Sequence, residues 1–164
     1  MARKANNYVD NKKLYEAIKE YRKLCYEADD SGEEHPPVTP YIGECFMEMS
    51  KGMARNKNFS GYSYIDDMIL DGVENSLKYI LSFDPEKSNN PFSFFSQGIY
   101  YAFLRRIAKE KKELYIKYKA SRQGVLGDTF SGDGEFADMN IDSAYTEHVD
   151  QYIKDYEDKM QKKK

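Results

Sequence analysis

The chain has 164 residues, two cysteines, two histidines and a formal net charge of −3. This length suits one domain with tails, and a chain of this length can bury a core without disulfides. No spacing of Cys, His, Asp and Glu is typical of a metal site, so we predict neither a bound metal nor another cofactor. The mean charge alone would argue against a nucleic-acid partner, and the absence of any apolar run as long as a membrane helix predicts a soluble, intracellular protein.

The charge is unevenly distributed along the chain. Seven cations and two acids lie from Arg105 to Lys119, whereas ten acids and one lysine lie from Asp128 to Asp158. A solvated surface is the simplest interpretation of either block. For the basic block we favour a functional interpretation, because aromatic residues adjoin it.

Two helices are predicted in the first third of the chain. The first covers residues 12–28, and Gly32 with the following prolines ends it. Its apolar stripe consists of Leu14, Ile18, Tyr21 and Cys25. The second begins at Thr39, a good N-cap, followed by Pro40 in the first turn, and runs to about Asn56. Its stripe consists of Ile42, Phe46, Met49 and Met53.

A third helix is predicted over residues 63–81, because Ser63 and Asp66 have capping-box spacing and Pro85 follows its end. We expect its core face to consist of Ile69, Val73, Leu77 and Ile80. Its polar face carries Asp67, Asp71, Glu74 and Lys78. From the pattern alone, a solvated surface is the default interpretation of that polar face.

The fourth predicted helix covers residues 92–119 and begins after the cap and proline Asn90-Pro91. Its expected core residues are Phe92, Phe95, Ile99, Phe103 and Ile107. A second line consists of Phe94, Gln97, Tyr101 and Arg105, with Tyr100, Leu104 and Lys111 beside it. This line either packs on another helix or stacks on unpaired bases. We favour stacking, because the same helix becomes strongly cationic.

The helical patterns along the whole chain predict an all-α fold in two parts. Residues 1–120 form a helical domain. Residues 121–164 form a partly flexible acidic segment, interrupted by Gly124, Gly127, Gly132 and Gly134, with a short last helix over about 143–161. The weak stripe of that helix consists of Tyr145, Val149, Tyr152 and Tyr156. No strand pattern is present.

Three motifs in the middle of the chain are recognisable together. They are Asp67-Met-Ile-Leu-Asp71-Gly72, the turn Phe83-Asp84-Pro85-Glu86-Lys87, and the helix start Phe92-Ser93-Phe94-Phe95-Ser96. Their order resembles region 2 of the bacterial sigma factors. Across about residues 7–118 the chain is similar to one branch of that family, the late-promoter sigma factors of T-even-type bacteriophages.

The resemblance implies that the third helix docks on the coiled coil of the β′ clamp of the host RNA polymerase core. The implied contact residues are Asp67, Leu70, Asp71, Val73, Glu74 and Leu77. Leu70 and Val73 replace the family's glutamine and asparagine, so this contact would be more apolar than usual.

The resemblance also implies that the fourth helix holds a melted, AT-rich element of late promoter DNA at the −10 position. The implied DNA-binding residues are Phe92, Phe94, Phe95, Gln97, Tyr100, Tyr101, Arg105, Arg106, Lys109, Lys111 and Lys112. Gly98 and Ile99 stand where primary sigma factors carry paired tryptophans. We therefore expect weak melting and a phage coactivator as a further partner.

The predicted function is that of a minimal, non-catalytic sigma factor without a −35-reading domain, monomeric when free and located in the host cytoplasm. The chain ends in lysines rather than in a short hydrophobic tail, so coupling to a sliding clamp is not implied. Two alternatives stay open: a helical protein that binds single-stranded nucleic acid without polymerase, and an adaptor or inhibitor that uses the docking helix without reading DNA.

Overall fold

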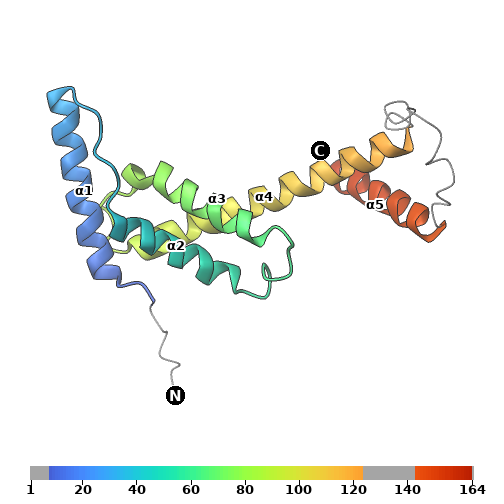
Figure 1. Ribbon diagram of the computed structural model, residues 1–164, viewed down its shortest axis with the longest axis horizontal. Coiled ribbons are helices and arrows are strands. Elements are labelled where there is room, and N and C mark those ends of the chain that lie inside the picture. Colours follow the sequence, from blue (N-terminus) through green and yellow to red (C-terminus); the bar gives the residue numbers. More distant parts are fainter. Residues whose placement is uncertain (1–7, 124–142, 164) are drawn as a thin grey trace, which may run out of the picture. The chain divides into compact units, whose positions relative to one another are not determined.

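The computed structural model describes residues 8–123 and 143–163 (Figure 1). In these residues the regular structure is entirely helical, which confirms the predicted all-α class. The elements are α1 (Asn11–Ser31), α2 (Pro40–Ala54), α3 (Ile65–Lys78), the 3-10 helix η1 (Ile80–Ser82), α4 (Pro91–Arg122) and α5 (Ser143–Gln161). The four glycines from Gly124 to Gly134 lie outside the described residues.

The chain forms two compact units, unit 1 (Met1–Arg106) and unit 2 (Ile107–Lys164). Both units contain part of α4, because the division follows Arg106 rather than residue 120, where the sequence placed it. Across the described ranges, no helix is both long enough and apolar enough to cross a bilayer.

Local side-chain chemistry sets most helix ends where the sequence predicts them. The Asp10 carboxylate accepts hydrogen bonds from the backbone N–H groups of the first turn of α1, and Gly32 ends that helix in the left-handed region, with φ +68°. Pro40 opens α2, although the side chain of Thr39 makes no capping bond. Asn90 caps α4 by accepting from the Ser93 N–H at 3.1 Å.

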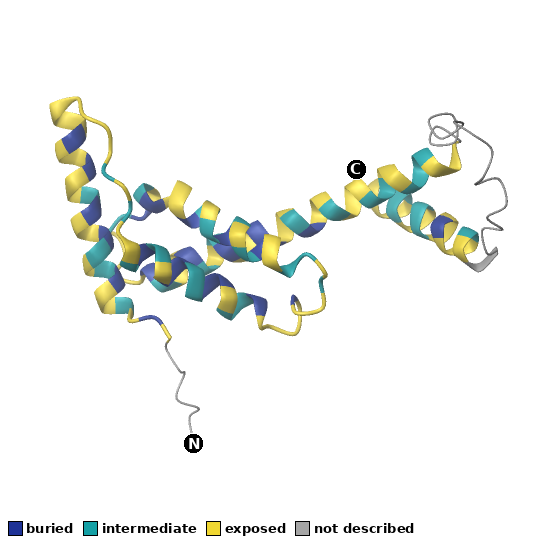
Figure 2. Ribbon diagram, in the orientation of Figure 1, coloured by how far each residue is buried: buried dark blue, intermediate teal, exposed yellow. Residues whose placement is uncertain are grey.

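The core of unit 1 combines aliphatic side chains with the buried rings of Phe46, Phe59, Phe83, Phe95 and Phe103, and Figure 2 colours the buried positions along its helices. The predicted stripes of α1 and α2 are buried, apart from the half-buried Met53. Phe46 of α2 meets Phe95 of α4 with ring centroids 4.6 Å apart. Phe83, from the turn before α4, is also buried and contacts the Phe95 ring. These aromatic contacts fix the start of α4 on the bundle.

The start and the register of α3 differ from the prediction. Its N-cap is Tyr64, which makes no capping bond, so the proposed capping box is wrong. The buried residues of α3 are Met68, Gly72 and Ser76, not the larger apolar residues that follow each of them. A Cβ atom on Gly72 would lie 2.7 Å from Ser50 Oγ and 3.0 Å from Ile99 Cγ2. Small residues therefore let α3 pack closely, and this turns Leu70 and Leu77 outward.

Candidate functional site

The outer surface of α3 carries alternating acids and leucines. Asp67, Leu70, Glu74 and Leu77 are all exposed, the leucines by 57% and 37%. Their spacing of three, four and three residues places them in one line along the helix. We call these four residues the α3 face. An exposed leucine pair beside carboxylates suits a partner that is apolar and basic.

Asp71 does not belong to this free surface, which corrects the expectation from the sequence. Its carboxylate accepts two hydrogen bonds from Arg106, Nε to Oδ2 at 2.6 Å and Nη2 to Oδ1 at 2.7 Å. Both side chains are mostly buried, with exposed fractions of 27% and 20%. A bidentate pair of this kind is among the stronger ion pairs. It fastens α3 to α4, and it leaves neither residue freely available for an outside partner.

Part of the predicted aromatic surface of α4 is exposed and part lies in the core. Phe94, Tyr100 and Tyr101 are exposed by 39%, 42% and 49%. Phe95 is only 2% exposed, so its expected contact with DNA is wrong, and Phe92 is half-buried with its ring 6.1 Å from that of Tyr8. The three exposed rings keep part of their surface open to solvent, which is compatible with stacking on a base.

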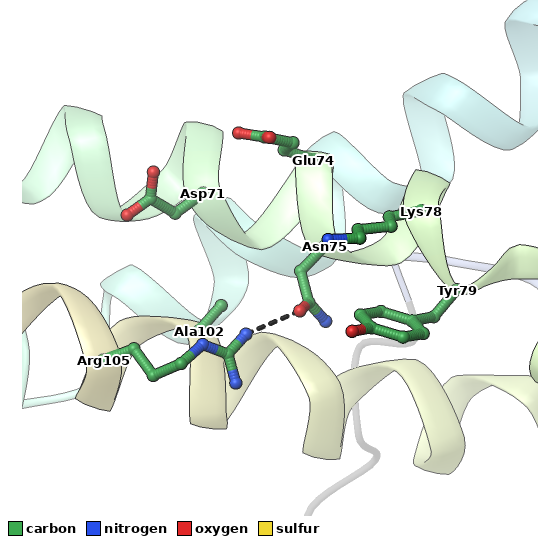
Figure 3. Close-up of a pocket in the computed structure, with 7 residues that line it drawn as sticks. All are labelled: Asp71, Glu74, Asn75, Lys78, Tyr79, Ala102 and Arg105. Carbon is green, nitrogen blue, oxygen red and sulfur yellow. Dashed lines mark hydrogen bonds between the residues drawn. The ribbon is translucent and has the colours of Figure 1, made fainter.

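A groove of about 410 Å³ lies between α3 and α4, beside these rings. Its lining residues are Asn75, Tyr79, Ser82, Phe94, Phe95, Gln97, Gly98, Tyr101 and Arg105. A Cβ atom on Gly98 would lie 3.1 Å from Asn75 Nδ2, so this glycine keeps the groove open. A second hollow of about 380 Å³, drawn in Figure 3, shares Asn75, Tyr79 and Arg105 with it. We call the first of these, beside the exposed rings, the α3–α4 groove.

The polar groups of the groove come from both helices. Arg105 Nη2 donates to Asn75 Oδ1 at 2.6 Å, and the Tyr79 ring lies beside this pair (Figure 3). Exposed rings supply stacking surfaces, while the amides of Asn75 and Gln97 supply both donors and acceptors. This combination fits a planar heterocycle with a hydrogen-bonding edge, which is the chemistry of an unpaired nucleobase.

Asn75 and Tyr79 were not predicted as parts of this site, and Gly98 was singled out only as the position of a missing tryptophan. Asn75 and Tyr79 follow Asp71 at intervals of four residues, so they share its side of α3. The predicted core positions of α3 each come one residue after the buried ones, so the prediction did not reveal that these residues share a side of the helix. Ile99, which we aligned with a stacking position of the sigma family, is fully buried and cannot contact a base.

The cationic stretch of α4 continues into unit 2. Lys109, Lys111 and Lys112 are exposed, and Lys109 forms an ion pair with Glu113 at 3.8 Å, one helical turn away. Such exposed pairs are weak and exchange readily with other ions. The three lysines are therefore exposed to solvent, and their contact with backbone phosphates stays a prediction.

Metal-ligating groups and thiols are the next features of the described residues. It contains no group of three or more His, Cys, Asp or Glu side chains that could hold a metal ion. Cys25 and Cys45 are buried. Burial also raises the pKa of the Cys45 thiol, which disfavours the reactive thiolate.

No protein-family model matches this chain, and a search of curated proteins finds no significant match. The resemblance to the sigma factors therefore stays a prediction. The features of the molecule that bear on its function are the α3 face, the α3–α4 groove and the exposed lysines.

Proposed function

We propose that this protein is a minimal sigma factor, which binds a bacterial RNA polymerase core through α3 and holds an unpaired promoter strand on α4. The observation that carries the proposal is the pairing of two surfaces within unit 1. A leucine and acid face lies on the outside of α3, and an aromatic groove opens between α3 and α4. The series of motifs that resembles a phage late-promoter sigma factor supports the same function.

The composition of the α3 face supports docking on another helix. Leu70 and Leu77 lie two turns apart, with Glu74 between them, which is the spacing of an apolar seam in helix-on-helix recognition. The flanking carboxylates favour a partner with arginines or lysines beside its own apolar stripe. In the proposed complex that partner is the coiled coil of the β′ clamp.

The α3–α4 groove supports binding of a strand that is already open. Stacking of a base on an aromatic ring contributes roughly 1–3 kcal/mol, whereas extracting a base from a duplex costs a few kcal/mol for each step. The exposed rings can therefore hold one or two unpaired bases but cannot open a duplex without help. We propose that an AT-rich, easily melted element is the target and that a coactivator assists opening.

A protein that binds single-stranded nucleic acid without polymerase is the second candidate. The groove and the exposed lysines favour it, because neither feature requires a polymerase. It gives no role to the exposed leucines of α3, and for that reason it ranks second.

Binding to purified core polymerase tests the proposed docking. Asp67→Lys with Glu74→Lys reverses two exposed charges on the α3 face and leaves the Asp71–Arg106 pair intact. We expect binding at least about tenfold weaker, since a charge-assisted contact is worth roughly 1.5–3 kcal/mol.

The matched control is Glu16→Lys with Glu20→Lys, which changes the net charge equally on exposed positions of α1. This control should bind core like the wild type. Equal binding by both double variants would remove polymerase docking on α3 from the proposal, and the second candidate would then be preferred.

A further inference from the structure

Within unit 2, α5 covers one side of the last turns of α4 with tyrosine rings. Tyr156 stacks on Tyr115, with centroids 4.4 Å apart and ring planes 16° apart. Tyr152 meets Tyr118 edge to face at 5.4 Å, and its hydroxyl donates to the Lys111 carbonyl. Two neighbouring rings of α4 are therefore occupied by rings of the same chain.

The same contact neutralises two cations of α4. Arg122 donates from Nε to Asp150 Oδ1 at 2.7 Å and from Nη2 to Oδ2 at 2.6 Å. Lys119 forms an ion pair with Glu157, which also accepts from the Tyr115 hydroxyl. The hydrogen bond that Lys119 donates to the Glu157 carboxylate is the largest cause that raises the Lys119 pKa above its ordinary value.

The acids of α5 take positions that phosphates of a nucleic acid would suit. A fork of two parallel N–H bonds from arginine recognises carboxylate and phosphate in the same way. A ring next to a cation is the usual arrangement for a base and its backbone phosphate. The covered side of α4 thus repeats the chemistry of its exposed aromatic surface.

This contact is also weak enough to be exchanged. The four charged side chains are 39% to 50% exposed, so each ion pair contributes little and is screened by salt. Val149 is the one buried residue among the described side chains of α5. A polyanion can therefore compete with α5 for the same side of α4.

We infer that Tyr115, Tyr118, Lys119 and Arg122 form a second site for single-stranded nucleic acid, which α5 covers in the free protein. This inference rests on the proposed function of α4 as a nucleic-acid helix. Displacing α5 adds two phosphate contacts and two stacking rings to the exposed lysines.

The test is binding of a fluorescent oligothymidylate to the full chain, measured by anisotropy over a salt series. Asp150→Asn with Glu157→Gln removes the two masking charges in nearly identical shapes. We expect binding roughly 3–10-fold tighter, and a plot of log K against log salt steeper by up to about 1.4, which corresponds to two further phosphate contacts on a single strand.

The matched control is Asp155→Asn with Asp158→Asn. These acids are also exposed on α5; Asp155 bonds only within that helix in the described contacts, and no described contact joins Asp158 to α4. The control makes the same change in net charge, so it should leave the salt slope unchanged. Adding Lys119→Ala and Arg122→Ala to the masking variant should abolish its gain.

Each other outcome overturns the inference. Equal gains for the masking variant and the control would show a general charge effect, and no gain for either would show that α5 does not compete. In both cases wild-type binding leaves the proposed function of α4 intact. If the wild type and every variant fail to bind the oligonucleotide, the proposed function fails together with the inference.

Discussion

The two halves of α4 are held in place by different forces. In unit 1, α4 buries Pro91, Phe95, Ile99, Ala102 and Phe103. In unit 2, only Ile107 of the α4 residues is buried, and the attachments of α5 are tyrosine contacts and exposed ion pairs. Apolar burial holds a surface in one shape, whereas exposed polar contacts can be exchanged. The first half thus presents a preformed groove, and the second presents a surface that can be uncovered.

The largest expected effect tests this difference in stability. Phe103→Ala removes a fully buried ring and should lower the free energy of unfolding of unit 1 by about 3–5 kcal/mol. Tyr118→Ala removes a half-buried ring from unit 2 and should leave unit 1 unchanged. Urea unfolding with amide exchange of each helix separates the two. A similar loss of α2 and α3 protection in both variants would mean that the halves are not independent.

The second expected effect concerns the groove. Gly98→Trp places an indole where the groove is open, so the groove should fill and binding of a single-stranded oligonucleotide should fall by about tenfold, equivalent to one lost stacking contact. Ser93→Trp, at an exposed position of α4 that does not line the groove, is the control. Unchanged affinity in a folded Gly98→Trp variant would show that bases do not enter the groove.

The third effect concerns the ion pair that fastens α3 to α4. Asp71→Asn and Arg106→Gln should each destabilise unit 1 by about 1–2 kcal/mol, because each removes charge-assisted hydrogen bonds that join α3 to α4. The double variant should lose less than the sum of the two, as a double-mutant cycle measures. Additive losses would mean that the pair contributes no coupling energy.

The smallest effect is the response of unit 2 to acid. Hydrogen bonds from Lys119 and Tyr115 lower the pKa of Glu157 below its ordinary value of 4.5. Its contribution to α5 attachment is therefore fully present above pH 4.5 and is lost as the pH falls through the lower folded value. Amide exchange of α5 should rise in that range. Glu157→Gln should remove the part of the response that this carboxylate causes, and an identical acid response in that variant would contradict the assignment.

The sequence predicted the helices well because their ends are chemically marked. Gly32, Asn90 and the prolines act locally, and the stripes of α1, α2 and α4 consist of large apolar residues. It failed at α3, where a small residue, Gly72, decides the register by close approach to Ser50 and Ile99. That contact joins three helices, and no periodicity within one helix reveals it.

The same limit applies to the site. The exposure of Leu70 and Leu77 follows from the register of α3. The ion pair of Asp71 follows from the position of Arg106 on the neighbouring helix, α4. The rings of Phe94 and Tyr101 were predicted to be exposed because the core line of α4 excluded them, and the structure confirms this. The groove beside them could not be predicted from the sequence, because only the tertiary fold brings α3 and α4 together.

Run-off transcription measures whether this protein acts as a sigma factor. Purified bacterial core polymerase is combined with this protein on a linear template that carries a premelted AT-rich element. We expect transcripts that begin at a fixed distance downstream of the element and that are absent with core alone. The double variant Asp67→Lys with Glu74→Lys should lose these transcripts, whereas the control Glu16→Lys with Glu20→Lys should keep them. Core polymerase that binds the protein yet produces no start-specific transcript on this template would contradict the account.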